Sequence, residues 1–321
     1  MKVSVIICAF NPRMAALERV LAALRGQTLP LTDWELLLID NASTEPLSQR
    51  VDLAWHPHAR IVREDRLGVA IARARGFSES CGELVVMVDD DNVLDPGYLE
   101  QGLKIAAEWP QLGAWGGSCV PEFEVPPPEH LRPYLWLLAL REVEEPRWTL
   151  QWSDQDAEPW GAGMCIRRRA ALAYAEQQAH APFRITGRTG NTFSTGSGED
   201  TEICYVVCSL GLGMGIFPSL RLVHMIPRQR LDEQHLVRIA ESVNISSMLL
   251  FLKWAGQRPA SPFAPLALSR LVKGLLFRRG VDRRMAWATY HAKVVVRRII
   301  AANPSSMPSR DRAPFRPPSA A

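Results

Sequence analysis

The chain has 321 residues, 47% of them hydrophobic, with 37 Lys and Arg against 34 Asp and Glu. This hydrophobic content excludes an intrinsically disordered protein, and a net charge of +3 excludes one that binds polyanions over its whole surface. The length is typical of about two domains. No signal-peptide pattern and no uninterrupted apolar stretch of about 18 residues is found, so we expect a cytoplasmic protein.

Positive charge is concentrated at the end of the sequence. Residues 271–321 hold eleven Lys and Arg against two Asp, a net +9, which leaves −6 on residues 1–270. A basic end on a mildly acidic body indicates a tail that meets an anionic surface, either lipid or nucleic acid. Of the two we expect peripheral contact with an anionic membrane at the inner face of the cell, and no nucleic-acid partner. A solvated helix face with a loose tail explains the same charge, and both interpretations stand at this point.

Short apolar strands alternate with helices over the first 120 residues. The pattern predicts strands at 3–8, 34–39, 60–62, 83–88 and 112–120, with helices at 13–25, at 70–80 and from Asp95-Pro96 onward. This alternation is typical of an α/β fold, a mostly parallel sheet flanked by helices. Ligands of such sheets bind at the carboxyl ends of the strands, and polar residues occupy those ends at Asn11, Asp40, Asn41 and 89–91.

The second half is less regular. Residues 121–159 predict an irregular, tryptophan-rich insertion, followed by a strand at 160–166, a helix at 167–177, a Gly/Ser/Thr-rich mobile loop at 184–198 and a helix at 199–210. A strand at 215–223 and helices at 232–256, 265–278 and 282–301 follow. We expect a catalytic domain over 1–225, a helical basic extension over 226–302 and a disordered tail over 303–321.

Three adjacent carboxylates follow the strand LVVMV at Asp89, Asp90 and Asp91. Such carboxylates repel one another unless a cation lies among them. Oxygen ligands favour Mg²⁺ or Mn²⁺, which in proteins often hold substrate phosphates. An acidic capping turn before the helix at Asp95 is the structural alternative.

Four segments in order carry a family resemblance. They read VSVIICAFN, IDNASTE, GVAIARARG and VMVDDDN, and with them residues 3 to about 225 resemble the family 2 glycosyltransferases, inverting enzymes of the GT-A fold that use nucleotide-diphosphate sugars. The chain departs from the usual pattern at Cys8-Ala9-Phe10, at Ala74 and at Glu45. These departures bear on which nucleotide is bound and leave the expected fold unchanged.

The resemblance assigns expected roles. Asp40 would accept from the base, Arg73 would lie near the diphosphate, and Asp91 would bind the metal. His224 would be a second metal ligand or a diphosphate contact. The remaining expected nucleotide-sugar contacts are Ala9, Asn11, Asn41, Asp89, Asp90, Trp160 and Gly161. Without the resemblance, Arg73 and His224 are equally explained as surface charges, and Trp160 as a core residue.

Glu199 and Asp200 begin a predicted helix directly after the Gly/Ser/Thr-rich loop. Acidic residues in a first turn commonly interact with the helix dipole, which is the structural explanation. In the resembling family, the second acid of an ED pair at this place is the catalytic base. The resemblance therefore implies that Asp200 is the base, while Glu199 could instead orient the acceptor.

Together these features predict a metal-dependent glycosyltransferase, hexosyltransferase-like and acting in polysaccharide biosynthesis. The donor would be a nucleotide-diphosphate sugar, with a UDP-sugar favoured, and the acceptor a hydroxyl on a glycan or lipid-linked sugar. Mn²⁺ or Mg²⁺ would be the cofactor. Two alternatives stand: a nucleotidyltransferase, which also uses aspartate–metal–phosphate chemistry, and a non-catalytic nucleotide-sugar-binding protein of the same fold.

Overall fold

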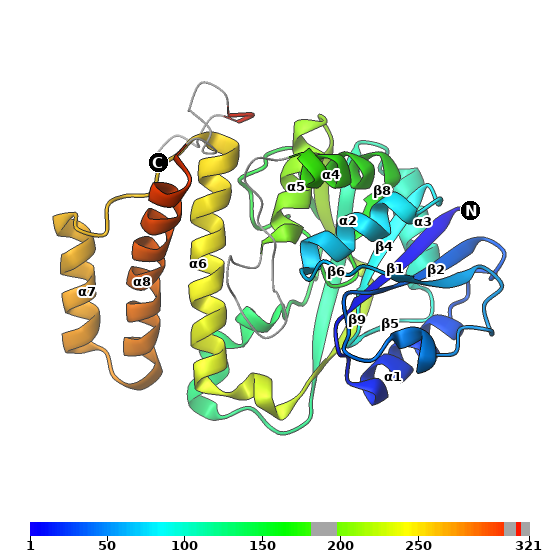
Figure 1. Cartoon of the computed structure of the whole chain (residues 1–321), viewed down its shortest axis with the longest axis horizontal. Coiled ribbons are helices and arrows are strands. Elements are labelled where there is room, and N and C mark those ends of the chain that lie inside the picture. Colours follow the sequence, from blue (N-terminus) through cyan, green and yellow to red (C-terminus); the bar gives the residue numbers. More distant parts are fainter. Residues whose placement is uncertain (181–197, 305–312, 316–321) are drawn as a thin grey trace. The chain divides into compact units, whose positions relative to one another are not determined.

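The computed structural model describes residues 1–180, 198–304 and 313–315 (Figure 1). Nearly all of the predicted loop at 184–198 and most of the predicted tail at 303–321 lie outside these residues. The chain divides into two compact units. The first comprises residues 1–124, 139–181 and 199–226, and the second comprises 125–138, 182–198 and 227–321. Residues 125–138, which the sequence analysis counted with the first domain, therefore belong to the second unit.

The described part of the first unit is built on a nine-stranded sheet. The strands are β1 (Val3–Ala9), β2 (Trp34–Asp40), β3 (Ala59–Arg63), β4 (Leu84–Asp89), β5 (Asn92–Leu94), β6 (Leu112–Phe123), β7 (Arg147–Thr149), β8 (Cys165–Arg167) and β9 (Gly213–Ile226). Their order is β3-β2-β1-β4-β8-β6-β9-β5, with β7 paired to β9. The β3-β2-β1-β4 half and the β6–β9 pair are parallel, whereas β5, β7 and β8 pair antiparallel. The predicted α/β fold with a central sheet is confirmed.

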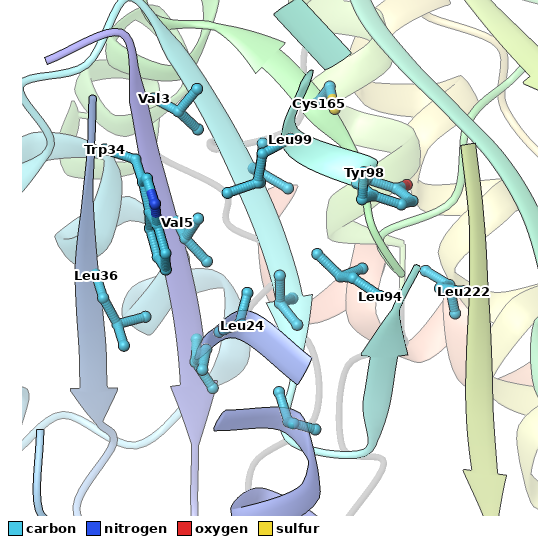
Figure 2. Packing of buried hydrophobic residues seen from close by; sticks show 14 of the residues in the cluster. Val3, Val5, Leu24, Trp34, Leu36, Leu94, Tyr98, Leu99, Cys165 and Leu222 are labelled. Carbon is cyan, nitrogen blue, oxygen red and sulfur yellow. The ribbon is translucent and has the colours of Figure 1, made fainter. Parts of the chain in front are cut away.

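Helices cover both faces of the sheet. They are α1 (Met14–Arg25), α2 (Val69–Glu79), α3 (Tyr98–Glu108), α4 (Arg168–His180) and α5 (Glu199–Ser209). Alternating residues of β1 show the two faces. Val3 and Val5 belong to the buried cluster that includes α1 and α3 (Figure 2), whereas a Cβ on Gly76 of α2 would lie 2.6 Å from Ile6 on the opposite face. Both faces of these strands are buried, which explains their continuous apolar sequences.

Strand register brings the polar strand ends to one edge of the sheet. Ala9 at the end of β1 pairs with Asp40 at the end of β2, and Cys8 pairs with Asp89 at the end of β4. The parallel direction of these three strands therefore places their carboxyl ends side by side, as the sequence predicts.

Several local predictions were wrong. Helix α3 begins at Tyr98 with Gly97 before it, because Asp95 closes a turn by accepting from the Tyr98 N–H, 3.0 Å away. Strand β8 is only three residues long, since the preceding Gly163 has a φ of +74°. The short strands β5 and β7 were not anticipated. The irregular 121–159 region contains β7 and a 3₁₀ helix, η2 (Glu129–Leu138).

The second unit is helical in its described part. A 3₁₀ helix, η3 (Arg228–Leu231), precedes the three helices α6 (Glu233–Ala255), α7 (Pro265–Phe277) and α8 (Gly280–Ala302). A further short 3₁₀ helix, η1 (Leu47–Gln49), belongs to the first unit. Helix α8 packs against α6 and α7, and α6 also contacts η2. Asp232 caps α6 by accepting from the Gln234 N–H at 2.8 Å, and Gly256 ends the helix at a φ of +63°. Standard start and stop signals thus explain its predicted limits.

Candidate active site

A buried arginine joins carboxylates from two distant segments. Arg73 on α2 is 4% exposed. Its Nη1 donates to Glu199 Oε1 at 3.0 Å, and its Nη2 donates to Asp89 Oδ1 at 3.3 Å. Burial lowers the pKa of Arg73, but the charges of Glu199, Asp89 and Asp200 outweigh that effect and raise it. The guanidinium therefore stays charged and holds the end of β4 to the start of α5.

Gly161 lies directly against this guanidinium. A Cβ on residue 161 would lie 2.8 Å from Arg73 Nη2, so a side chain there would displace the arginine. The Gly161 N–H also donates to Asp200 Oδ2 at 3.0 Å. The close approach of backbone to Arg73 is the structural reason for glycine at this position.

Asp200 and Glu199 have different partners although they are neighbours. Glu199 is buried in the ion pair with Arg73. Asp200 is partly exposed, and its two oxygens accept from the backbone N–H groups of Gly161 and Thr201, the latter at 2.9 Å. Burial and the neighbouring Glu199 charge raise the pKa of Asp200, whereas Arg73 and the two N–H donors lower it; the net shift is upward. The upward shift makes Asp200 a better proton acceptor than an ordinary aspartate.

The three-aspartate motif separates into two environments. Asp89 meets Arg73, whereas Asp91 is 7% exposed and its Oδ2 lies 3.5 Å from His224 Nε2. Strand β5 produces this second contact, because Asn92 pairs with His224 on β9. His224 was expected after the strand but lies within it. Asp90 is in the turn between the two environments and is half-buried.

The Asp91–His224 pair offers one carboxylate and one imidazole to a metal. Over the described ranges, no group of three or more His, Cys, Asp and Glu side chains is placed to hold an ion. A carboxylate with an imidazole suits Mn²⁺, and Mg²⁺ is commonly bound by one or two carboxylates together with substrate phosphates and water. The two residues therefore fit a metal whose other ligands come from a bound diphosphate.

The carboxylate at the end of β2, Asp40, accepts hydrogen bonds from the loop that follows the strand and from β3. Asp40, 2% exposed, accepts from the Ser43 and Leu47 N–H groups, each at 3.0 Å, and from Arg63 Nη1 at 2.8 Å. Burial raises the pKa of Asp40, but these hydrogen bonds outweigh it and leave the pKa below its usual value. Asp40 thus has three protein donors, and its expected contact with the nucleotide base stays a prediction.

Asn11 and Asn41 have similar roles. Asn11 Oδ1 accepts from the Thr44 N–H at 2.9 Å, while Asn41 donates to the Arg66 carbonyl at 2.8 Å and accepts from the Gly68 N–H at 2.9 Å. Asn11 is exposed with a φ of +45°, a conformation that asparagine tolerates. Ala9 is buried at the end of β1. These residues shape the strand ends, and Asn11 alone of the three is exposed.

Sequence reasoning missed a buried carboxylate beside Asp200. Glu158 is 6% exposed, and its Oε1 accepts from Thr201 Oγ1 at 2.6 Å. Arg141 donates to the Glu158 carbonyl at 2.7 Å, and its guanidinium lies 3.8 Å from the centre of the Trp160 ring. One face of Trp160 is therefore covered by an arginine. The only sequence signal was the clustering of charged and aromatic residues before Gly161.

Comparison with known proteins gives partial relatives. The chain is 30% identical over 104 residues to an uncharacterised glycosyltransferase, YwdF, of Bacillus subtilis, covering 32% of this chain and 38% of that protein. It is 25% identical over 147 residues to a glucosyl-dolichyl phosphate glucuronosyltransferase of Haloferax volcanii, covering 44% and 46%. It is 32% identical over 101 residues to a cholesterol galactosyltransferase of Borreliella burgdorferi, covering 31% and 27%. The matched part thus spans less than half of each relative.

The fold and the sequence pattern agree. The crystal structure of S. aureus TarS 1–349 superposes with a TM-score of 0.53 over 93% of this chain and 92% of that one, at 12% identity, which shows a shared GT-A-type fold. The model for glycosyl transferase family 2 matches residues 4–169, just over half of the chain. That stretch contains β1, Arg73 and the three aspartates. The chain belongs to glycosyl transferase family 2.

Proposed function

We propose that this protein transfers a sugar from a nucleotide-diphosphate donor to an acceptor hydroxyl with inversion at the anomeric carbon. The acceptor oxygen forms a bond to that carbon as the carbon–oxygen bond to the diphosphate breaks. The nucleoside diphosphate leaves with the electron pair, and Asp200 takes the acceptor proton. Family membership supports glycosyl transfer. The proposal of a single displacement, which inverts the anomeric carbon, rests on the placement of one base, Asp200.

The observation that carries the proposal is the contrast between Asp200 and Glu199. Glu199 is neutralised by Arg73 at 3.0 Å, whereas Asp200 is partly exposed and is held by backbone N–H groups. Those donors fix the carboxylate without neutralising its charge. General-base catalysis of this kind contributes roughly 10²–10⁴ in rate.

The donor proposal is a UDP-sugar with Mn²⁺ or Mg²⁺ held by Asp91 and His224. The bound metal would neutralise charge on the leaving diphosphate. Asp91 and His224 would bind it, and Arg73 would add a fixed positive charge near the end of β4. Asp89, Asp90 and Gly161 border the same region.

The acceptor proposal is a lipid-linked sugar or glycan in polysaccharide assembly. Two of the relatives are named for lipid-type molecules, dolichyl phosphate and cholesterol. These names describe those proteins, and here they favour the lipid-linked member of the pair.

Replacing Asp200 with Asn tests the assignment of the base. Asparagine keeps the size but has a single acceptor oxygen, so it retains only one of the hydrogen bonds from Gly161 and Thr201, and it cannot take a proton. We expect transfer from UDP-sugars to fall at least a hundredfold while UDP binding, measured by thermal shift with Mn²⁺, stays near wild type. Asp156→Asn, an exposed neighbouring change, is the matched control and should be neutral.

Glu199→Gln separates the two acids. An inactive Glu199→Gln beside an active Asp200→Asn would move the base to Glu199. Activity in both variants would overturn the mechanism. A nucleotidyltransferase would instead release pyrophosphate from a nucleoside triphosphate, and a binding protein would bind UDP-sugar without hydrolysing it.

We also propose that α7 makes the peripheral membrane contact. Its apolar residues Leu268, Val272, Leu275 and Leu276 recur at spacings of 4, 3 and 1 and are 39%, 51%, 38% and 70% exposed. Its buried residues, Ala267 and Gly274, are both small. An amphipathic helix with an exposed apolar face and basic flanks is typical of membrane-surface binding.

Charge favours lipid over a second copy of the chain as the partner. Residues 265–284 hold six Lys and Arg and one Asp, a net +5. Two such surfaces would repel each other, whereas anionic lipid gains roughly 1 kcal/mol per basic residue near its surface. By length and composition, helix α6 is also long and apolar enough to cross a membrane. However, 39% of its most apolar 18-residue stretch is buried, and the core helices of soluble proteins have the same length and composition.

Vesicle co-sedimentation tests this contact. We expect the protein to bind vesicles of phosphatidylcholine with phosphatidylglycerol and to bind phosphatidylcholine alone much less. The double change Val272→Asp and Leu276→Asp should abolish binding, while Leu150→Asp, at an exposed leucine of the first unit, should not. Equal binding to both vesicle types, or an unaffected double variant, would contradict the proposal.

A further inference from the structure

Glu158 is a buried acid to which the proposed reaction gives no role. It lies between β7 and β8 and is 6% exposed. Its carboxylate accepts from a neutral hydroxyl, Thr201 Oγ1, at 2.6 Å, while Arg141 donates to its backbone carbonyl. Burying a carboxylate is unfavourable without compensation, so this position calls for a physical reason.

Glu158 closes a ring of contacts around the proposed base. The chain runs from Glu158 to Gly161, whose N–H donates to Asp200 Oδ2 at 3.0 Å. Thr201 N–H donates to Asp200 Oδ1 at 2.9 Å, and Thr201 Oγ1 returns to Glu158. The two backbone donors that hold Asp200 come from two segments, and the Glu158–Thr201 hydrogen bond ties those segments together.

Resting on the proposed function, we propose that Glu158 is a positioning residue for Asp200, fixing that carboxylate through Thr201 and tuning its charge from the adjacent buried site. The hydrogen-bonded ring accounts for the first effect, the fixed position of the Asp200 carboxylate. The second effect, on charge, follows because neighbouring carboxylates disfavour each other's ionisation, and the Asp200 charge acts on Glu158 in this way.

The surrounding charges agree with this coupling. Burial raises the pKa of Glu158 to about 7, with the Asp200 charge adding to the rise, while the Thr201 hydrogen bond and the Arg141 charge lower it. Burial raises the pKa of the neighbouring Cys204, Tyr205 and Cys208, and the Glu158 charge adds to each rise. The groups that face Glu158 are thus Asp200, Thr201, Cys204, Tyr205 and Cys208 of α5 and Arg141 of the preceding segment.

A double-mutant cycle in melting temperature tests the charge coupling without needing activity. Glu158→Gln keeps an oxygen acceptor for Thr201 and removes the charge. We expect it to raise the Tm by a few degrees at pH 8.5 and to have little effect at pH 5.5, where Glu158 is protonated. In an Asp200→Asn background the rise at pH 8.5 should be smaller. An equal rise in both backgrounds would overturn the coupling.

Kinetics test the positioning effect on hydrolysis of UDP-glucose and UDP-galactose. Thr201→Val breaks the ring, and we expect kcat to fall about tenfold or more with KM for the donor unchanged, because small displacements of a catalytic group are costly. Thr201→Ser should restore kcat. In Glu158→Gln the acid limb of the kcat–pH profile should move to lower pH, while Glu144→Gln, at an exposed site, should leave it in place.

A failure of the proposed function and a failure of the positioning proposal give different results. A wild-type protein that hydrolyses neither donor would contradict the proposed function, and the Tm cycle would still decide whether Glu158 and Asp200 are coupled. A Thr201→Val variant with normal kcat, or a Glu158→Gln profile superimposable on wild type, would overturn the positioning proposal while leaving the transferase intact.

Discussion

Asp89 and Asp91 are two residues apart in the sequence yet meet different counter-charges. Asp89 lies beside the guanidinium of Arg73, a cation that the chain itself supplies and buries. Asp91 lies beside His224, whose imidazole is charged only when protonated. The protein therefore has a permanent positive charge at one end of the motif, and at the other end lie the two residues that we propose bind an exchangeable cation. Asp89 and Asp91 meet different partners because the chain turns at residues 90–91 and β5 then pairs with β9, which carries His224.

The largest expected effect is the loss of the fixed cation. Arg73→Met would leave Glu199 and Asp89 without the charge that stabilises them, and removing one partner of a buried ion pair typically costs about 3–5 kcal/mol. We expect a fall of that order in the free energy of unfolding, measured with urea at neutral pH. Arg75→Met, two residues along the same helix and in an exposed pair with Glu79, should change it by less than about 1 kcal/mol. Equal losses would remove the contrast between the two sites.

The removable cation is tested through Asp91. Asp91→Ala should abolish the Mn²⁺-dependent part of UDP binding, a loss of about 10- to 100-fold in affinity, while the Tm without ligand stays near wild type. Isothermal titration with UDP, with and without EDTA, measures it. A wild-type UDP affinity that is unchanged by EDTA would contradict metal binding by Asp91 and His224.

Asp40 adds a third carboxylate to the comparison, one that accepts hydrogen bonds from Ser43, Leu47 and Arg63. Its pKa is lowered in the folded state, so its stabilising contribution is present above the unfolded pKa and is lost as pH falls through the folded value. We expect Asp40→Asn to lower stability at pH 7 by about 1–2 kcal/mol and to have less effect near pH 2–3. UDP affinity should change less than about twofold. A large loss of UDP affinity with unchanged stability would instead support the expected contact of Asp40 with the nucleotide base.

The sequence predicts the sheet edge well because local patterns determine it. The apolar strands, the helix limits of α1 and α2 and the positions of Asp40 and Asp89 at strand ends all follow from neighbouring residues. The Arg73–Glu199 pair joins residues 126 apart, and the family resemblance, not periodicity, brought both to attention.

What escaped prediction depends on contacts between distant segments. Strand β5 has three residues, too few for a periodic signal, and exists because it pairs with β9 more than a hundred residues later. In the sequence, Glu158 cannot be told from an exposed acid, because its hydrogen bond with Thr201 comes from a distant segment.

The hydrogen bond from Gly161 to Asp200 has a consequence for how this chain can be altered. A main-chain donor is unaffected by the identity of the side chain, so substitutions around residue 161 can reshape the surroundings of the proposed sugar site without removing that donor. The constraint that remains at 161 is one of volume, because a Cβ would meet Arg73 at 2.8 Å. Directed evolution of acceptor preference should therefore tolerate changes at Trp160 or Ala162 while retaining glycine between them.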